Sequence, residues 1–352
     1  MSIYKSDIDA AKNNWDTFWN GTNKRPMLSA VLPRKGKTPV EKPPYAAGHD
    51  GNFAPVLDQI CGWVETHEFL GEAIPFHYLE FAADHFSILL GADLVFPGEG
   101  GGWPLHFVNS WEKTELSFKR HGKWWRRTVD FAEAIKKRFG DDIMIASPTF
   151  VANLDALVAV RGANDVLLDM MDQPALIRRA LDQVLKSYKE ILAEYEILFE
   201  YKRLGSITRH GIYSKGRINV PQCDLSCMLS GEMFREFVLP YLKAEMECYD
   251  AVEYHLDGPD AIRHLEDLCS IDKLGVIQWV SGAGNEKKDW TWLHDKIDAL
   301  GKGQILWANP ELAVSYAKKY KSRKLFFLLS VKSRQEFDDC TGLLEETWSM
   351  KT

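Results

Sequence analysis

The stretch AVEYHLDGPDAIRHLEDL, residues 251–268, joins a predicted strand directly to a predicted helix. Residues 252–257 include β-branched, aromatic and other apolar side chains, as in a short buried strand. Gly258 follows, and Pro259 suits the first position of a helix. Apolar residues then recur at helical spacing, at Ile262, Leu265 and Leu268. A strand that passes straight into a helix is the unit from which parallel α/β folds are built.

His255 and Asp257 stand where this predicted strand ends. Side chains alternate between the two faces of a strand, so these two residues point to the same side. Ligands of parallel α/β folds bind at the carboxyl ends of the strands, where side chains face open space. An imidazole and a carboxylate placed there can bind a metal, relay a proton or hold a polar substrate.

The same alternation of strand and helix recurs along the chain. Further apolar runs closed by polar or small residues include residues 27–33, 206–210, 275–280, 304–309 and 324–329. Such runs are typical of parallel strands that are buried on both faces. About eight strand–helix units, with no Pro/Ser-rich linker, predict one (β/α)8 TIM barrel over residues 1–352.

We expect two additions to this barrel. Residues 1–25 are predicted to form an N-terminal helical arm with an aromatic face. Residues 105–130 are predicted to insert a β-hairpin, in which residues 116–118 pair with residues 124–126 around a turn at Gly122. Both additions would leave the strand–helix alternation of the barrel intact.

Composition argues against several classes of partner. The formal net charge is −7, and no basic stripe compensates for it, which argues against nucleic acid. No apolar run approaches the roughly 20 residues of a membrane span, and the first residues are too polar for a signal peptide. Six cysteines show no disulfide-framework spacing. We therefore expect a cytoplasmic protein that acts on a small molecule.

Polar and aromatic side chains follow the predicted strands. They are His77, Arg209, His210, Gln222, Asp224, His255, Asp257, Gln278, Trp279, Trp307 and Asn309. A lone histidine at a strand end is more often a hydrogen-bonded structural residue than a catalyst. The functional interpretation depends on convergence, because a barrel gathers all strand ends at one mouth.

Two further features bear on the ligand. Trp103, Trp279 and Trp307 near one mouth would form flat walls for an aromatic or macrocyclic ligand, although tryptophan at strand ends more often packs in the core. Arg34, in a basic loop after the first strand, could meet an anionic group or only be solvated. The tryptophans and the basic loop therefore leave open both an aromatic or macrocyclic ligand and an anionic ligand.

The sequence leaves metal binding open. The pair His255 and Asp257 offers two ligands, whereas a catalytic zinc ion usually has three protein ligands and an open position. No segment has a fixed metal spacing such as Cys-x-x-Cys or His-Glu-x-x-His. The Gly-x-Ser-x-Gly pattern of serine hydrolases is also absent.

Three segments resemble the uroporphyrinogen decarboxylase superfamily, which includes methyltransferases that work with corrinoid proteins. They are MLSGEMFREFVLP (228–240), YHLDG (254–258) and IQWVSGAG (277–284). The resemblance is strongest over about residues 205–310. It implies a (β/α)8 barrel with a deep cleft at the carboxyl ends of the strands, and a homodimer.

The chain departs from both branches of this superfamily. True decarboxylases carry Arg-Gln-Ala-Gly-Arg-Tyr after the first strand and a Phe-Ser-Asp triplet, where residues 33–36 read PRKG and residues 86–88 read FSI. The methyltransferases bind zinc through a His-x-Cys pair and a later cysteine. This chain has His255, Asp257 and Ser330 at those places, so a metal site would need harder ligands.

The first functional prediction is methyl transfer between a small methylated amine or aryl methyl ether and a corrinoid carrier on a partner protein. His255, Asp257 and Asp224 are the predicted catalytic residues, and His255 and Asp257 are the predicted ligands of zinc or a similar metal. The predicted substrate-binding residues are Arg209, His210, Gln222, Trp103, Gln278, Trp279, Trp307, Asn309, His77 and Arg34.

Two alternatives stay open at this point. A metal-free decarboxylase would hold a substrate carboxylate with Arg34, Lys35 or Arg209, and Asp257 would stabilise a protonated intermediate. A barrel that binds a tetrapyrrole or corrinoid without turning it over would use the tryptophans instead. Loss of His255 or Asp257 should abolish turnover in the two enzymes and only weaken binding in the third case.

Overall fold

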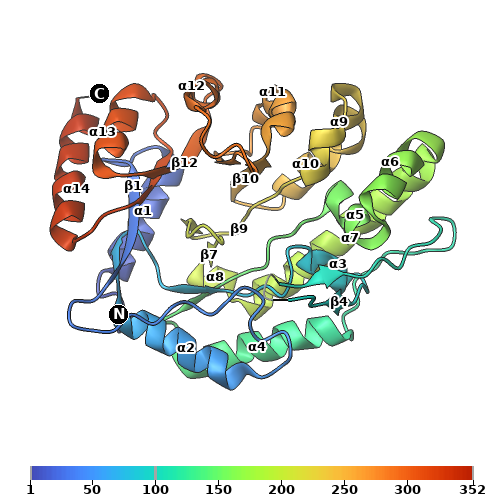
Figure 1. Cartoon of the computed structure of the whole chain (residues 1–352), viewed down its shortest axis with the longest axis horizontal. Coiled ribbons are helices and arrows are strands. Elements are labelled where there is room, and N and C mark those ends of the chain that lie inside the picture. Colours follow the sequence, from blue (N-terminus) through green and yellow to red (C-terminus); the bar gives the residue numbers. More distant parts are fainter. Residues whose placement is uncertain (1, 99–100, 351–352) are drawn as a thin grey trace.

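A computed structural model describes residues 2–98 and 101–350 as an α/β fold, with strands at the centre and helices around them (Figure 1). The main sheet has seven strands, and all neighbouring pairs are parallel except β1 with β2. Their order is β2 (His67–Gly71), β1 (Met27–Pro33), β13 (Leu325–Leu329), β12 (Gly303–Ala308), β11 (Val276–Val280), β10 (Ala251–Asp257) and β9 (Ile218–Asn219). The predicted α/β class and mostly parallel central sheet are confirmed.

Shorter strands continue the arrangement beyond β9. They are the parallel pair β3 (Phe76–Tyr78) and β6 (Met144–Ala146), and the antiparallel pairs β7 (Ser206–Ile207) with β8 (Tyr213–Ser214) and β4 (Leu94–Val95) with β5 (Trp103–Pro104). β6 lies beside β7, and β7 lies beside β9. Within the described residues these pairs form separate sheets, so the hydrogen-bonded strands are not joined into one ring.

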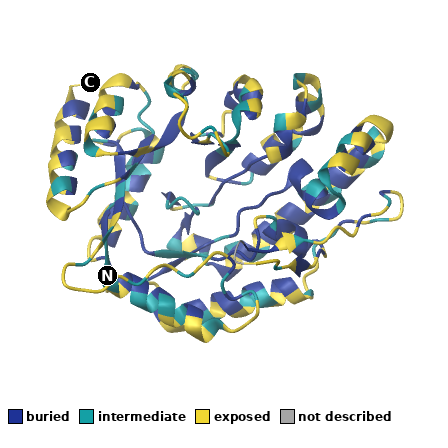
Figure 2. Cartoon of the chain, in the orientation of Figure 1, coloured by how far each residue is buried: buried dark blue, intermediate teal, exposed yellow. Residues whose placement is uncertain are grey.

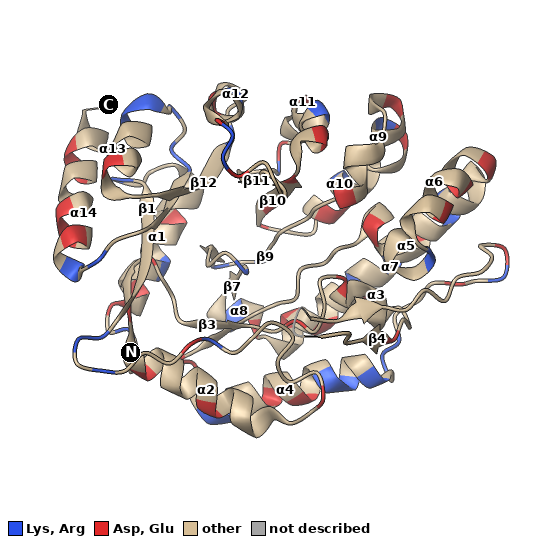
Figure 3. Cartoon of the chain, viewed as in Figure 1, with Lys and Arg blue, Asp and Glu red and all other residues tan. Residues whose placement is uncertain are grey.

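Helices cover the outer face of the strands, and their exposed sides face solvent (Figure 2). After α1 (Ile8–Asn20) they are α2 (Phe53–Thr66), α3 (His85–Leu89), α4 (Lys123–Phe139), α5 (Asn153–Arg161), α6 (Ala163–Asp172), α7 (Pro174–Leu198), α8 (Tyr201–Leu204), α9 (Gly231–Phe237), α10 (Leu239–Met246), α11 (Leu265–Cys269), α12 (Thr291–Ala299), α13 (Pro310–Lys319) and α14 (Arg334–Ser349). Two 3-10 helices, η1 (Asp224–Met228) and η2 (Pro259–His264), follow β9 and β10. Most charged side chains lie on these outer helices and on loops (Figure 3).

An inner core forms where one face of the strands meets helix α1 (Ile8–Asn20). It gathers apolar side chains from strands along the whole curve, including Met27, Met144, Ile207, Ile218, Ala251, Val276, Ile305 and Phe326. Trp15 of α1 is fully buried, and its ring lies 5.0 Å from that of Phe326, near the start of β13. The helix predicted within residues 1–25 is therefore present, but it packs against the amino ends of the strands and leaves their carboxyl ends open.

The predicted hairpin within residues 105–130 is wrong. Residues 123–139 form helix α4, and residues 116–118 lie in an extended loop that belongs to no strand. Buried side chains recur at helical spacing along α4, at Trp124, Trp125, Thr128, Phe131, Ala132, Ile135 and Phe139. This amphipathic face packs into the outer core, the large cluster of buried side chains between the strands and the surrounding helices. A two-stranded ribbon would bury much less apolar surface, so the helix is favoured.

Two further features concern the chain as a whole. None of the helices that the structure describes has both the length and the apolar character needed to cross a bilayer. All six cysteines are free thiols, in agreement with the lack of a disulfide-framework spacing in the sequence.

Candidate metal and substrate site

Strand β10 places three polar side chains on its inner face. Glu253, His255 and Asp257 alternate with Tyr254 and Leu256, which are buried on the other side. Glu253 is the deepest of the three and is fully buried, whereas His255 and Asp257 are half-buried near the carboxyl end of the strand. The period-two pattern of a strand therefore produces a polar row that runs from the core to the open end.

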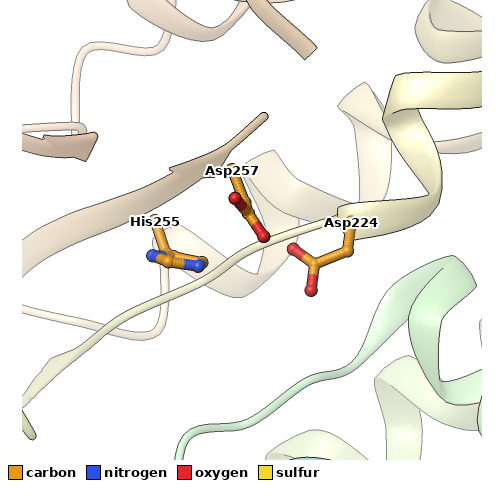
Figure 4. Close-up of side chains that lie close together, drawn as sticks. All are labelled: Asp224, His255 and Asp257. Atoms are coloured by element: carbon orange, nitrogen blue, oxygen red, sulfur yellow. The ribbon is translucent and has the colours of Figure 1, made fainter. Parts of the chain in front are cut away.

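Asp224 meets His255 and Asp257 at this end of the sheet (Figure 4). Each of the three residues offers a ligand atom, and these atoms all lie within 4.8 Å of one another. Asp224 begins η1, which follows β9, the strand next to β10. The three side chains thus come from one strand and from the segment that follows its neighbour, as expected for a site at the carboxyl ends of a parallel sheet.

His255 has a fixed orientation. Its Nδ1–H donates a hydrogen bond to the side-chain oxygen of Gln278, which is its register partner on β11. Burial and the nearby Arg209 lower the pKa of His255 to about 4, so the ring is neutral near pH 7. The lone pair of Nε2 is then free, and neutral imidazole with its other nitrogen hydrogen-bonded is the form that binds metal ions.

The pKa values of both aspartates of this group are raised. Burial and the adjacent Asp257 carboxylate raise the pKa of Asp224, and burial raises the pKa of Asp257. Oδ1 of Asp257 is buried without a hydrogen-bond partner among the described residues. A divalent cation would neutralise both carboxylates and satisfy this oxygen, so one imidazole and two carboxylates fit a metal ion with nitrogen and oxygen ligands.

Asp155 in the first turn of α5 holds the Asp224 segment in place. Its buried carboxylate accepts hydrogen bonds from the backbone N–H groups of Asp224 (2.7 Å) and Leu225 (3.0 Å). The side-chain amide of Gln222 donates to Asp224 Oδ2 at 3.0 Å. Burial and the charge of Asp224 raise the pKa of Asp155. The position of Asp224 is therefore set by α5, a helix on the outer face of the sheet.

Arg209 and His210, just after β7, border the three residues. Arg209 donates hydrogen bonds to Thr149 Oγ1 and Gln222 Oε1, each at 3.2 Å. Nδ1–H of His210 donates to the carboxylate of Glu253, and the His210 ring stacks toward that of His255 with 6.4 Å between centroids. Glu253 thereby orients His210, whose other ring nitrogen can accept or give a proton.

Other predicted site residues lie elsewhere. Trp279 points to the helix side of β11, where its ring lies 5.1 Å from that of Trp290, because Gln278 next to it faces inward. Asn309 accepts a hydrogen bond from Leu312 N and caps α13. Trp307 stands at the end of β12 with 55% of its surface exposed. Among these residues, Trp307 and Asn309 are exposed at the carboxyl end of β12, whereas Trp279 is buried.

Three predicted residues belong to the periphery or to a neighbouring cavity. Trp103 lies in β5 of the separate pair β4–β5 and is 57% exposed, so the three tryptophans do not form one wall. Two cavities have Arg209 in their lining. Arg34 follows β1, donates its backbone N–H to Thr66 O, and lines neither of these two cavities. His77 of β3 does line one of these cavities, and burial with the charge of Lys42 lowers its pKa to about 3.

Several residues of the site were missed from the sequence. Glu253 could have been found, since it shares the period-two pattern of His255 and Asp257. Asp155 and Lys42 carry no local signal, because their roles depend on segments far apart in the chain. No family model matches the chain, and no curated protein matches it in sequence.

Proposed function

We propose that the chain is a metal-assisted methyltransferase that moves a methyl group between a small methylated substrate and a corrinoid carrier on a partner protein. The convergence of Asp224, His255 and Asp257 carries this proposal. Removing a methyl group from nitrogen or oxygen leaves an electron pair on that atom, which must gain a proton or a Lewis acid. The site offers residues for both of these roles close to one another.

Asp224, His255 and Asp257 would hold a zinc or similar divalent ion. When bound, such an ion supplies Lewis-acid stabilisation of the atom that loses the methyl group. Asp257 stands where the related methyltransferases have a cysteine, so the site would favour harder ligands and substrates than a thiol. Gln278 orients His255, and Asp155 fixes Asp224 through its backbone.

His210 would donate the proton that the substrate heteroatom needs when it loses its methyl group. Glu253 accepts the hydrogen bond from His210 Nδ1–H and compensates a positive charge on the ring. The other ring nitrogen can give a proton to the substrate heteroatom as its bond to the methyl carbon breaks. Arg209 and Gln222, linked by a hydrogen bond, would position the substrate beside Asp224.

We also propose that the strands are arranged as a (β/α)8 barrel of the uroporphyrinogen decarboxylase superfamily, in which hydrogen bonds do not join all the described strands into one ring. Support comes from the inner core, to which strands along the whole curve contribute, and from α1 across their amino ends. The segments that carry the resemblance, residues 228–240, 254–258 and 277–284, form α9–α10 and the ends of β10 and β11. Two of the three segments therefore border the candidate site.

The test is methyl transfer to free cob(I)alamin, followed by the absorbance of methylcobalamin. Methylated amines and aryl methyl ethers serve as donors for the zinc-loaded protein. We expect wild type to use at least one donor class, Asp257→Asn to lose this activity, and His121→Ala, a change in an exposed loop, to retain it. Equal rates in wild type and Asp257→Asn would contradict the proposal.

A metal-free decarboxylase is the second candidate, because Arg209 and Lys42 line cavities suited to a carboxylate. In that reaction the carboxylate would lie against Arg209, and Asp257 would stabilise the protonated product-forming state. Carbon dioxide release by the metal-free protein, without methyl transfer, would favour this candidate. The binding-only alternative has less support, since Trp103 lies in the separate pair β4–β5 and Trp279 packs against Trp290, so the tryptophans do not form one wall.

A further inference from the structure

Two adjoining cavities open beside Arg209, each with a volume of about 240 Å³. Both are lined by Lys42, Trp63, Phe76 and Arg209. Tyr45, Tyr78 and Ile60 add apolar and aromatic walls to the first, and Ser29, His210 and Leu328 border the second. Each is smaller than the ~300–1,000 Å³ typical of sites for drug-sized ligands. The space suits a ligand with a single ring and is too small for a tetrapyrrole.

Lys42 brings an unpaired positive charge into these cavities. Its ammonium lies 4.4 Å from the centroid of the Trp63 ring and 4.9 Å from that of Phe76. Within residues 2–98 and 101–350, no ion pair or hydrogen bond involves this ammonium. Lys42 as a whole residue is exposed, but its ammonium lies among protein atoms, and this burial lowers its pKa. An ammonium that lies over two rings and pairs with no described carboxylate gains from an anion placed beside it.

Arg209 provides a second cation, whose hydrogen bonds go to neutral side chains while the buried Glu80 and Glu253 act on it electrostatically without forming an ion pair. Its guanidinium donates hydrogen bonds to Thr149 and Gln222, and it forms no ion pair with any described residue. Glu80 lies nearby, but Tyr45 OH (2.6 Å) and Thr149 N (3.0 Å) already donate to its two oxygens, and burial raises its pKa to about 7. The cavity lining therefore carries more positive than negative charge.

We infer that these cavities form a subsite for a small aromatic carboxylate, held by its anionic group between Lys42 and Arg209. The hydrogen bonds from Arg209 to Gln222 and from Gln222 to Asp224 join this subsite to the metal-binding residues. A ring that carries the carboxylate at one end could present a methoxy group at the other. The inference rests on the proposed function and names its substrate class as aryl methyl ethers that bear a carboxylate.

The competing role for Lys42 is structural, since its contacts with Trp63 and Phe76 tie residues 34–52 to α2 and β3. Three variants separate binding from folding. Lys42→Met removes the charge, and Lys42→Arg keeps it. Lys123→Met is the matched control, because the Lys123 ammonium also lies over a tryptophan ring, 4.5 Å from the centroid of Trp124, but outside the cavities. Thermal unfolding of each variant reports any loss of folding.

The experiment is isothermal titration of the metal-free protein with 4-methoxybenzoate and with its neutral analogue 4-methoxybenzamide. We expect the acid to bind at least about tenfold more tightly than the amide, and Lys42→Met to lose that preference. Lys42→Arg and Lys123→Met should keep it. Equal binding of acid and amide to wild type, or no binding of the acid up to about 10 mM, would overturn the inference without any variant.

The same titration separates this inference from the proposed function. Preferential binding of the acid by a protein that never binds metal would uphold the subsite and contradict the methyltransferase. Metal binding at Asp224, His255 and Asp257 without a preference for the acid would do the reverse. An unchanged preference in Lys42→Met would assign Lys42 the structural role and overturn the inference.

Discussion

His255 and Gln278 face each other across two neighbouring parallel strands, and the His255 ring donates its Nδ1–H to the Gln278 side chain. The pairing fixes the ring in one tautomer and turns its other nitrogen toward two carboxylates. A histidine that served only the core would have no need for such an orientation toward charged groups at the open end of the sheet.

Loss of Gln278 should weaken metal binding. In Gln278→Ala the ring of His255 loses its acceptor, and affinity for zinc should fall by about 10- to 100-fold. Competition with a chromogenic chelator measures this change. Gln304→Ala is the matched control, because Gln304 Oε1 accepts from His294 Nδ1 at 2.8 Å outside the site. Equal losses in both variants would mean that the effect is one of general stability.

Asp155 should act on the metal site from a distance. Asp155→Ala removes the acceptor of two backbone N–H groups, which should cost about 1–3 kcal/mol of unfolding free energy and displace Asp224. Metal affinity should therefore fall together with stability. Asp169→Ala, which loses the buried contacts with Arg161 and Trp111, should be destabilised without any change in metal affinity. Similar metal affinities in the two variants would count against a positioning role for Asp155.

The buried Glu80 should make stability depend on pH. Its pKa is raised to about 7 by burial, above the ordinary value of 4.5. Folding therefore favours the protonated form, so its contribution is complete below about pH 4.5 and is lost as pH rises through about 7. Relative to Glu80→Gln, wild type should lose up to about 3 kcal/mol of unfolding free energy between about pH 5 and pH 8. Denaturant unfolding at several pH values measures this difference, and parallel curves would contradict it.

The N-terminal helix should be essential to the fold. Trp15 is fully buried, its ring packs on Phe326, and its indole N–H donates to Glu72 O at 3.2 Å. Trp15→Ala should cost about 3–5 kcal/mol in denaturant unfolding, as expected for a large side chain in a core. Trp292→Ala is the control, because Trp292 is 51% exposed and should cost far less. A small effect of Trp15→Ala, similar to that of Trp292→Ala, would contradict an essential role of α1 in the fold.

Short-range periodicity explains what the sequence could predict. Strand β10 and the polar pair His255 and Asp257 follow from a period of two and from the glycine after the strand. The same rule extends to Glu253. It also shows why Gln278 and Trp279 cannot both face the site, since adjacent residues of a strand point to opposite sides.

Contacts between distant segments explain what could not be predicted. The polar and basic composition around residue 122 favoured a turn, but burial of one face against the outer core makes residues 123–139 a helix. Lys42 lies in an irregular loop, and only the packing of Trp63 and Phe76 around it gives it a place beside Arg209. Asp155 likewise meets Asp224 because two elements separated by many residues pack together.

The most direct test of the metal site is the metal content of the purified protein, measured by mass spectrometry for wild type, His255→Ala and His121→Ala after dialysis against zinc. We predict about one zinc ion per chain in wild type and in His121→Ala, and none above background in folded His255→Ala. The same zinc content in His255→Ala as in wild type, or no bound zinc in any of the three, would contradict a metal ion held by Asp224, His255 and Asp257.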